Sequence, residues 1–376
     1  MNATEQVAPA TRSSGRVIQA APLESPDEFV RAVAALSGAE PLVADMQGYV
    51  GRNDNWRVPT ADAGDLFVKR LRGDRRQVQA RMSRLLAYQD VIAAHPQREA
   101  ATPRFHGADR EQSLLVFDHL PESRAASDLL AGDEFTVELA HRLGRVLAEI
   151  HRLPKIPLDI EEIVEGKALT AFYALSSDDY ANCSGGEVEA WAMLQHDREL
   201  VRALERLRDM TADAPTAATH CDIRLDQFLL AGDDVHVIDW EEFRYSDPAR
   251  DVGGFVGEFL HHCAARMFAE LDVEAGLSPG AAHDAILAHG ERQLEKIQGH
   301  IARFWAGYRE LAEIDDGLAV RATGYAGWHF FDRLLAGAVH GAKLTAAERG
   351  MAGIGRNALT HPERFAPSIG LDRGVI

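Results

Sequence analysis

Apolar side chains recur at three- and four-residue intervals in several long segments of the chain. The clearest segments are residues 75–94, 135–153 and 287–311, where the apolar positions form one stripe along the segment. This spacing is typical of amphipathic helices that bury one face. Beyond Asp251 almost the whole chain follows it, so the sequence predicts a largely helical second half.

Shorter apolar runs with the character of strands are concentrated in the first third of the chain. They comprise residues 42–43, 48–51, 55–58, 66–71, 104–107 and 113–117. Ser25 followed by Pro26 predicts the start of a helix, with Ser25 as the N-cap. The pattern therefore predicts a polar N-terminal tail (residues 1–24), a small mixed lobe (residues 25–119) and a large helical lobe (residues 120–376).

The charge balance limits the classes of partner. The chain of 376 residues has 58 acidic and 40 basic residues, which gives a formal net charge of −18. A general nucleic-acid binder needs a basic surface, so no nucleic-acid partner is expected. An acidic surface favours cationic partners, although solubility alone also explains such a charge.

Neither a membrane segment nor a disulfide framework is expected. No apolar run approaches the roughly 18 residues that span a bilayer, and the N-terminus lacks a hydrophobic signal core. The cysteines Cys183, Cys221 and Cys263 match no zinc-binding spacing, and their odd number leaves one unpaired in any disulfide scheme. The reduced cytoplasm is therefore the expected location.

The most specific pattern of the sequence lies between residues 220 and 241. Asp222 precedes a predicted hairpin of two short apolar strands, and Asp239 directly follows it. The turn at residues 232–234 would bring the two acids together. A kinase needs such a pair, because one acid orients and deprotonates the substrate hydroxyl while the other holds the magnesium that bridges the ATP phosphates.

In order and spacing, this region resembles the catalytic and metal-binding loops of the aminoglycoside phosphotransferase family, which is related to the protein kinases. The matching residues are His220, Asp222, Asp239, Trp240, Glu241, Asp247, Pro248 and Asp251. The resemblance covers roughly residues 40 to 340. It implies an α+β, protein-kinase-like fold of two lobes, with a small β-rich N-lobe and a large, mostly helical C-lobe.

The resemblance also implies a role for each residue of these loops. Asp222 would be the catalytic acid–base group, and Arg224 would grip the transferring phosphate. Asp239 would bind Mg²⁺, together with Gln227, which stands where the family has an asparagine. Structural support would come from His220, Asp247 and Asp251, the last two as caps of the next helix.

Candidate nucleotide-binding residues lie in the first lobe. Lys69 sits in an apolar run, where it would contact the ATP phosphates, although a lysine on an edge strand would look similar. Gly48 and Gly51 would belong to a hairpin that covers the phosphates, or to an ordinary strand turn. Phe117 and His119 lie where a kinase chain crosses between lobes beside the adenine, although an ordinary loop explains them too.

One element of the family pattern is missing. Relatives carry a glutamate on the helix predicted here over residues 75–94, and this glutamate pairs with the lysine. Here the 70s and 80s contain no glutamate, and Gln79 is the nearest substitute. A neutral amide cannot make the charge-assisted bond. Together with Gln227, this departure leaves open a pseudokinase scaffold that binds a peptide or partner enzyme without transferring phosphate.

Short strings around residues 224–229, 239–243, 247–253 and 361–366 are similar to the phosphotransferase-like subunits of class V lanthipeptide synthetases. This resemblance implies that Ser and Thr of a ribosomal precursor peptide are phosphorylated, with separate lyase and cyclase partner proteins. The alternative is a kinase of a small molecule such as an antibiotic, a sugar or an amino alcohol. Acidic residues in 155–215 would then bind a cationic substrate, or simply form a solvated face.

Overall fold

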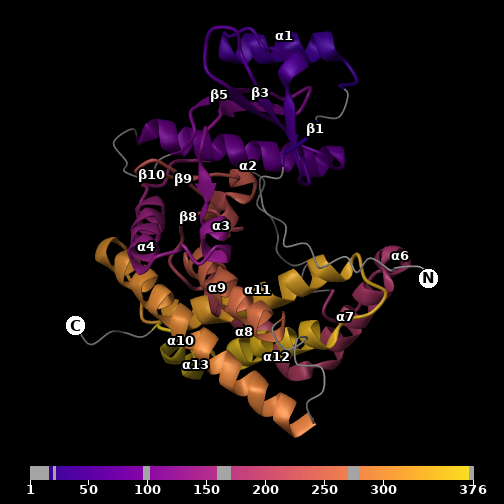
Figure 1. Cartoon of the computed structure of the whole chain (residues 1–376), viewed down its shortest axis with the longest axis vertical. Helices are drawn as coiled ribbons and strands as arrows, with labels where there is room; N and C mark the ends of the chain where they lie inside the picture. Colours follow the sequence, from indigo (N-terminus) through magenta and orange to yellow (C-terminus); the bar gives the residue numbers. More distant parts are fainter. Residues whose placement is uncertain (1–16, 20–22, 96–101, 159–170, 270–278, 372–376) are drawn as a thin grey trace. The chain divides into compact units, whose positions relative to one another are not determined.

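The computed structural model describes residues 17–19, 23–95, 102–158, 171–269 and 279–371 (Figure 1). The chain folds into two compact units. The first unit comprises Met1–Gln89, Ala101–Phe135 and Leu225–Glu241. The second comprises Asp90–Ala100, Thr136–Arg224 and Glu242–Ile376. Asp239 and the hairpin before it therefore belong to the first unit, whereas Asp222 belongs to the second.

A six-stranded antiparallel sheet forms the centre of the first unit, in the order β1-β2-β3-β4-β6-β5. Its strands are β1 (Val17–Gln19), β2 (Gln47–Tyr49), β3 (Asp54–Val58), β4 (Leu66–Arg70), β5 (Phe105–Asp109) and β6 (Leu114–Asp118). Strand β1 comes from the segment that the sequence predicts as a tail. Lys69 lies on β4, which is hydrogen-bonded on both sides, so the explanation of Lys69 as an edge-strand lysine is wrong.

Helix α1 (Pro26–Ser37) covers one face of this sheet (Figure 1). Its buried residues Phe29 and Val33 pack against Trp56, Val58 and Val68 of the strands. The helix begins where the sequence predicts, but the Ser25 side chain makes no capping hydrogen bond. The Ser25 carbonyl accepts the first helical bond, from the Phe29 N–H at 3.1 Å, as the residue before a helix normally does. Pro26 favours the start because its ring fixes a helical φ and its missing N–H has no partner in the first turn.

The remaining elements of the first unit hold the later hairpin. They are η1 (Val43–Asp45), β7 (Arg124–Ala125), α3 (Ala126–Ala131), η2 (Leu225–Gln227), β9 (Phe228–Ala231) and β10 (Asp234–Val237). Strands β10, β9 and β7 form an antiparallel sheet in that order. Gly232 takes a left-handed φ of 58° in the predicted turn, a conformation that glycine adopts without steric cost. Helix α2 (Arg75–Ala94) has the predicted bounds and begins in this unit.

Helices dominate the second unit. They are α4 (Val137–His151), α6 (Ser177–Asn182), α7 (Gly185–His196), α8 (Arg198–Ala212), α9 (Ala249–Ala269), α10 (Pro279–Leu311), α11 (Leu318–Ala338), α12 (Ala346–Thr360) and α13 (Pro362–Ser368). A two-stranded antiparallel sheet of β8 (Ala217–Thr219) and β11 (Arg244–Ser246) lies among them. The short helix η3 (Trp240–Glu242) spans the division between the units. The predicted α+β class is confirmed.

Two glycines allow α4 and α10 to cross in close contact (Figure 1). A Cβ atom added at Gly144 would lie 2.1 Å from the Phe304 carbonyl oxygen, and one at Gly307 would lie 2.0 Å from the His141 carbonyl oxygen. Each glycine therefore makes room for the backbone of the other helix.

Among the helices that the structure describes, none combines the length and apolar character needed to cross a bilayer.

Candidate active site

Lys69 is buried on β4 and contacts two carboxylates of the same unit. Its Nζ atom forms an ion pair with Asp239 and lies 3.0 Å from Glu241 Oε2. The residue is only 6% exposed. Burial by itself would lower the pKa of Lys69, but the charges and hydrogen bonds of Asp239 and Glu241 outweigh it and raise the pKa. Lys69 is therefore a fixed cation.

Glu241 receives hydrogen bonds from three further residues of the first unit. Asn53 Nδ2 donates to Glu241 Oε2 at 3.1 Å, and Arg81 Nη1 lies 3.5 Å from Oε1. Arg84 Nε donates to the Glu241 carbonyl oxygen at 2.7 Å. A buried carboxylate without such partners would be strongly unfavourable. Glu241 is thus held on all sides, and it orients Lys69.

This arrangement explains the missing helix glutamate. The carboxylate that pairs with Lys69 comes from the segment after β10, and α2 contributes the cations Arg81 and Arg84 to that carboxylate. Gln79, the nearest substitute for that glutamate in the sequence, is exposed on α2. The signal for Glu241 was available in the Asp-Trp-Glu string, but its partners are more than 150 positions away in the sequence.

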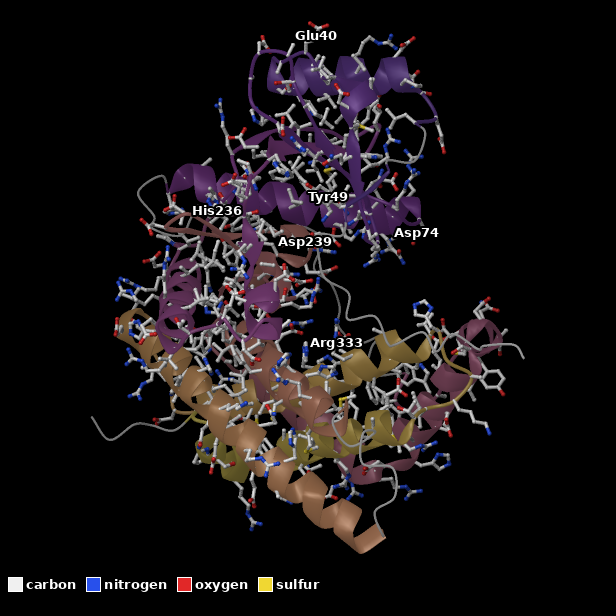
Figure 2. The ribbon with its side chains drawn as sticks, in the orientation of Figure 1. Glu40, Tyr49, Asp74, His236, Asp239 and Arg333 are labelled. Carbon is white, nitrogen blue, oxygen red and sulfur yellow. The ribbon has the colours of Figure 1, made fainter. Side chains whose placement is uncertain are left out.

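Asp239 follows the β9–β10 hairpin and belongs to the same unit as Tyr49. Figure 2 labels both residues. Asp239 has a left-handed φ of 71°. The N–H of the preceding Ile238 donates to the Gln227 carbonyl oxygen at 3.1 Å, which ties Asp239 to Gln227. Trp240 stacks on Tyr88 of α2, with ring centroids 3.5 Å apart. These contacts hold the backbone on both sides of Asp239, whose carboxylate contacts Lys69.

Gln227 and Asp239 provide oxygen donors of the kind that magnesium prefers. A carboxylate oxygen and an amide oxygen suit a hard divalent cation, which usually takes one or two protein carboxylates together with substrate phosphates. Asp239 and Gln227 therefore fit a magnesium ion by the chemistry of their oxygen atoms. Within the described ranges, no three His, Cys, Asp or Glu side chains lie close enough to hold a metal ion by themselves.

The predicted nucleotide-binding residues lie on the sheet that carries Lys69. Phe117 on β6 pairs with Phe67 on β4, and Leu115 on β6 pairs with Lys69 on β4. Phe67 and Lys69 are two positions apart on one strand, so the Phe117 ring lies on the same face of the sheet as Lys69. His119 Nε2 lies 2.9 Å from the Tyr49 hydroxyl. Burial, followed by the charge of Arg57, lowers the pKa of His119, which favours the neutral ring.

The two predicted glycines differ in their surroundings. Gly48 lies within β2 and pairs with Trp56 on β3. Gly51 lies in the turn between these strands, where an added Cβ atom would be 2.8 Å from Asn55 Nδ2. Both therefore belong to the β2–β3 hairpin, whose strand β3 neighbours β4.

In the second unit, Asp251 organises the loop that carries Asp222. Asp251 is fully buried at the start of α9 and accepts hydrogen bonds from the backbone N–H of His220 at 2.6 Å and of Cys221 at 2.7 Å. His151 Nε2 lies 3.1 Å from the same carboxylate, and His151 Nδ1 lies 2.7 Å from the Tyr308 hydroxyl. Burial would raise the pKa of Asp251, but the contacts with His151 and His220 outweigh it and lower the pKa.

Asp222 itself is accessible to a substrate. Its side chain is 44% exposed, and Arg224 Nη1 lies 2.7 Å from Asp222 Oδ2. The N–H of Asp222 contacts His220 Nδ1 at 3.4 Å. The preceding Cys221 has a left-handed φ of 68°, which costs a non-glycine residue about 1–2 kcal/mol. The loops of both acids thus contain a residue in a strained backbone conformation, as functional loops often do.

Asp247 stabilises the entry into α9. Its Oδ1 atom accepts a hydrogen bond from the Ala249 N–H at 3.0 Å, and Arg321 Nε donates to Oδ2 at 2.6 Å. Arg250 Nε donates to the Cys221 carbonyl oxygen at 3.1 Å. The start of α9 is therefore bonded both to α11 and to the Asp222 loop.

Several of the acidic residues expected to bind a cationic substrate have local structural partners in the described structure. Asp159, Glu161, Glu162 and Glu165 lie outside the described residues. Glu187 completes a capping box with Ser184 at the start of α7, and Glu189 forms an ion pair with Arg349. Asp178 and Asp179 lie in the first turn of α6, where carboxylates suit the helix dipole. These acids have local structural partners or positions.

Solved structures resemble this chain over most of its length. The structure of a choline/ethanolamine kinase family protein from Mesorhizobium loti has a TM-score of 0.52 at 17% identity, covering 92% of this chain and 99% of that chain. Choline kinase LicA from Streptococcus pneumoniae has a TM-score of 0.51 at 12% identity, with coverages of 89% and 98%. The amicoumacin kinase hAmiN, in complex with AMP-PNP, Ca²⁺ and Ami, has a TM-score of 0.53 at 12% identity, with coverages of 90% and 94%. The likeness confirms the predicted protein-kinase-like fold.

The family match agrees with the fold. No curated protein sequence matches the chain. The family model described as "Phosphotransferase enzyme family" (APH) matches residues 51–285. This match spans more than half of the chain and includes Lys69, the Asp222 loop and Asp239. The chain therefore belongs to the phosphotransferase enzyme family.

Proposed function

We propose that the protein transfers the γ-phosphate of ATP, bound with Mg²⁺, to the hydroxyl group of a Ser or Thr in a ribosomal precursor peptide. The proposal that the protein binds ATP rests on one observation, the buried Lys69 in contact with both Asp239 and Glu241. A fixed ammonium beside a potential metal ligand is the arrangement that neutralises ATP phosphates in kinases.

The chemistry would follow from the functional groups that the two units provide. Asp222 accepts the proton of the acceptor hydroxyl, whose oxygen forms a bond to the γ-phosphorus. The bond between that phosphorus and the β–γ bridging oxygen breaks, and ADP leaves with its electron pair. Arg224, which is paired with Asp222 at 2.7 Å, provides a guanidinium for the charge on the phosphoryl oxygens.

Asp239 and the Gln227 amide oxygen would hold the metal ion. When bound, the ion would supply positive charge to neutralise the phosphates and the charge that develops on the leaving group. The glutamine side chain is one methylene longer than the asparagine of the family pattern. It would still offer an amide oxygen, which is a ligand type that magnesium accepts.

The peptide acceptor rests on the sequence strings shared with class V lanthipeptide synthetase subunits, and a lyase and a cyclase would be the partner proteins. A second candidate is a small-molecule alcohol. It is favoured by similar structures that bear the names of choline and amicoumacin kinases and of a microcompartment-associated aminopropanol kinase. Two departures from the family pattern motivate the pseudokinase alternative, the missing helix glutamate and Gln227. The first no longer supports it, because Glu241 pairs with Lys69 in place of the helix glutamate.

The nucleotide site is tested by calorimetric titration with a non-hydrolysable ATP analogue, with and without Mg²⁺. We expect magnesium-dependent binding to the wild type, and weaker binding to Lys69→Ala and Asp239→Asn. Gln79→Ala is the matched control, because this exposed α2 side chain is expected to leave binding unchanged. Absence of binding at millimolar nucleotide to the wild type would contradict the proposal.

The acceptor is tested by mass spectrometry of the precursor peptide after incubation with ATP and Mg²⁺. Each phosphorylated residue adds about 80 Da. Asp222→Ala should bind the nucleotide but lose transfer. Phosphorylation of small alcohols but of no peptide would favour the second candidate, and nucleotide binding without any transfer would favour a scaffold.

A further inference from the structure

The turn between β2 and β3 (residues 50–53) is held in place by the side chain of Asn53, which is only 7% exposed. Its Nδ2 atom donates to Glu241 Oε2 at 3.1 Å. Its Oδ1 atom accepts from the Arg72 N–H at 3.1 Å and from Arg81 Nη2 at 3.2 Å. The amide thus turns its donor to a carboxylate and its acceptor to a guanidinium, which is the orientation that its charges favour. One side chain joins the turn to three other segments of the first unit.

The turn and Lys69 share one acceptor atom. Lys69 Nζ lies 3.0 Å from Glu241 Oε2, the same oxygen that accepts from Asn53. Asn55 on β3 pairs with Lys69 on β4, and Asn55 Nδ2 donates to the Asn53 carbonyl oxygen at 3.2 Å. The turn is therefore tied to the surroundings of this buried ammonium in two ways, through Glu241 and through β3.

The turn also has backbone donors that are available to a ligand. Within the described ranges, the N–H groups of Gly51, Arg52 and Asn53 donate to no protein acceptor. Gly51 and Arg52 are exposed. Successive backbone N–H groups of a turn are suited to binding an anion. The turn thus offers donors to an anion that binds beside Lys69.

A turn that is fixed before binding has an energetic advantage. In protein kinases a glycine-rich loop covers the phosphates of ATP. Here Gly51 is the only glycine among residues 50–53, and the buried amide of Asn53 follows it by two positions. Because ordering a flexible loop costs conformational entropy, a loop that is ordered only on binding weakens the affinity. The hydrogen bonds of Asn53 meet this cost when the protein folds.

We propose that Asn53 is a positioning residue for the nucleotide. It holds the β2–β3 turn beside the Lys69–Glu241 pair, so that the backbone N–H groups of the turn meet the phosphates of ATP in a preformed arrangement. Asn53 acts through the turn, and its side chain does not contact the nucleotide. This inference rests on the proposed function, because it takes ATP as the ligand of Lys69.

The first measurement follows the freedom of the turn in Asn53→Ala without any ligand. Arg52 is exposed and directly precedes Asn53, so trypsin cleavage after Arg52 reports how often the turn opens. Each cleavage rate is divided by that of the same bond in a short synthetic peptide, which corrects for the altered sequence. We expect cleavage of Asn53→Ala to be about tenfold faster than that of the wild type, since hydrogen bonds to charged groups are lost.

The second measurement compares two ligands by calorimetry, a non-hydrolysable ATP analogue with Mg²⁺ and adenosine, which has no phosphate. The affinity of Asn53→Ala for the ATP analogue should fall about tenfold, and its affinity for adenosine should stay unchanged. General damage to the fold would weaken both ligands alike, so this difference identifies a positioning role. Asn357→Ala, which removes an exposed amide on α12, is the control and should change neither the cleavage nor the affinities.

The outcomes separate this inference from the proposed function. Faster cleavage without a loss of affinity for the ATP analogue, a loss of affinity without faster cleavage, or equal losses for both ligands would each overturn the role of Asn53. If the wild type bound no ATP analogue, this inference would fall together with the nucleotide site. A loss confined to the ATP analogue, in a protein that phosphorylates no hydroxyl, would support the inference and contradict the proposed kinase activity. If Asn53→Ala does not fold, Asn53→Ser serves in its place with the same expected results.

Discussion

Replacement of Glu241 by Gln removes one negative charge while keeping the shape of the side chain. Lys69 Nζ and Arg81 Nη1 lie 3.0 Å and 3.5 Å from the two carboxylate oxygens. At an effective dielectric constant of about 20, each contact corresponds to an attraction of about 5 kcal/mol. The cost of burying the carboxylate offsets much of this attraction. Loss of one partner of a buried ion pair therefore costs a net of about 3–5 kcal/mol.

We therefore expect Glu241→Gln to lower the free energy of unfolding by about 3–5 kcal/mol, measured by urea denaturation. In this variant Lys69 keeps its ion pair with Asp239 but loses its ion pair with Glu241, so the position of the ammonium group is less well fixed. The rate of phosphate transfer should fall by about 10- to 100-fold, the equivalent of one charged hydrogen bond.

Gln79→Glu is the matched comparison for this prediction. It adds a carboxylate at the helix position that the sequence suggests, but Gln79 is exposed, so the added charge should rescue neither stability nor transfer in Glu241→Gln. The reasoning would be refuted if Glu241→Gln retained wild-type stability within about 1 kcal/mol together with wild-type transfer, or if Gln79→Glu restored both.

Three further predictions concern other parts of the structure. Asp222→Ala should retain nucleotide affinity by calorimetry and lower the transfer rate by about 10²- to 10⁴-fold, whereas Asp239→Asn should lose the magnesium dependence of binding. The pKa of Glu258 is lowered from 4.5 to about 2, so its stabilising contribution is present above pH 4.5 and is lost as the pH falls towards 2. Glu258→Gln should accordingly be less stable than the wild type at pH 7 by about 3 kcal/mol, with a difference that disappears near pH 2 in acid-unfolding curves. Gly144→Ala should lower the unfolding free energy by about 1–3 kcal/mol or more, because the added methyl group would lie 2.1 Å from the Phe304 carbonyl oxygen; unchanged thermal unfolding would contradict the close crossing of α4 and α10.

Local patterns of the sequence were sufficient to predict most elements. The helix over residues 75–94 and the hairpin after Asp222 are present because their apolar periodicity and the Gly232 turn agree with the tertiary structure. The strand at Val17–Gln19 was not predicted, because three residues carry no periodicity and their pairing with β2 is a long-range contact.

The candidate site shows the same division between local and long-range information. The order of acids around residues 220–251 identified the loops, since each is a short string. The role of Glu241 was not predicted, because Lys69, Arg81 and Arg84 reach it only in the folded sheet and helix. Nor was the contact between Glu258 on α9 and His329 on α11, which meet through the close packing of these two helices.

The position of Glu241, two residues after Asp239, has a consequence for regulation. In protein kinases, the helix that carries the glutamate can swing away and switch the enzyme off by breaking the pair with the lysine. Here a movement of α2 would withdraw Arg81 and Arg84 but would leave both carboxylates beside Lys69. The three-residue segment from Asp239 to Glu241 thus provides both carboxylates that contact Lys69. A movement of α2 alone would therefore weaken the support of Glu241 without removing either carboxylate from Lys69.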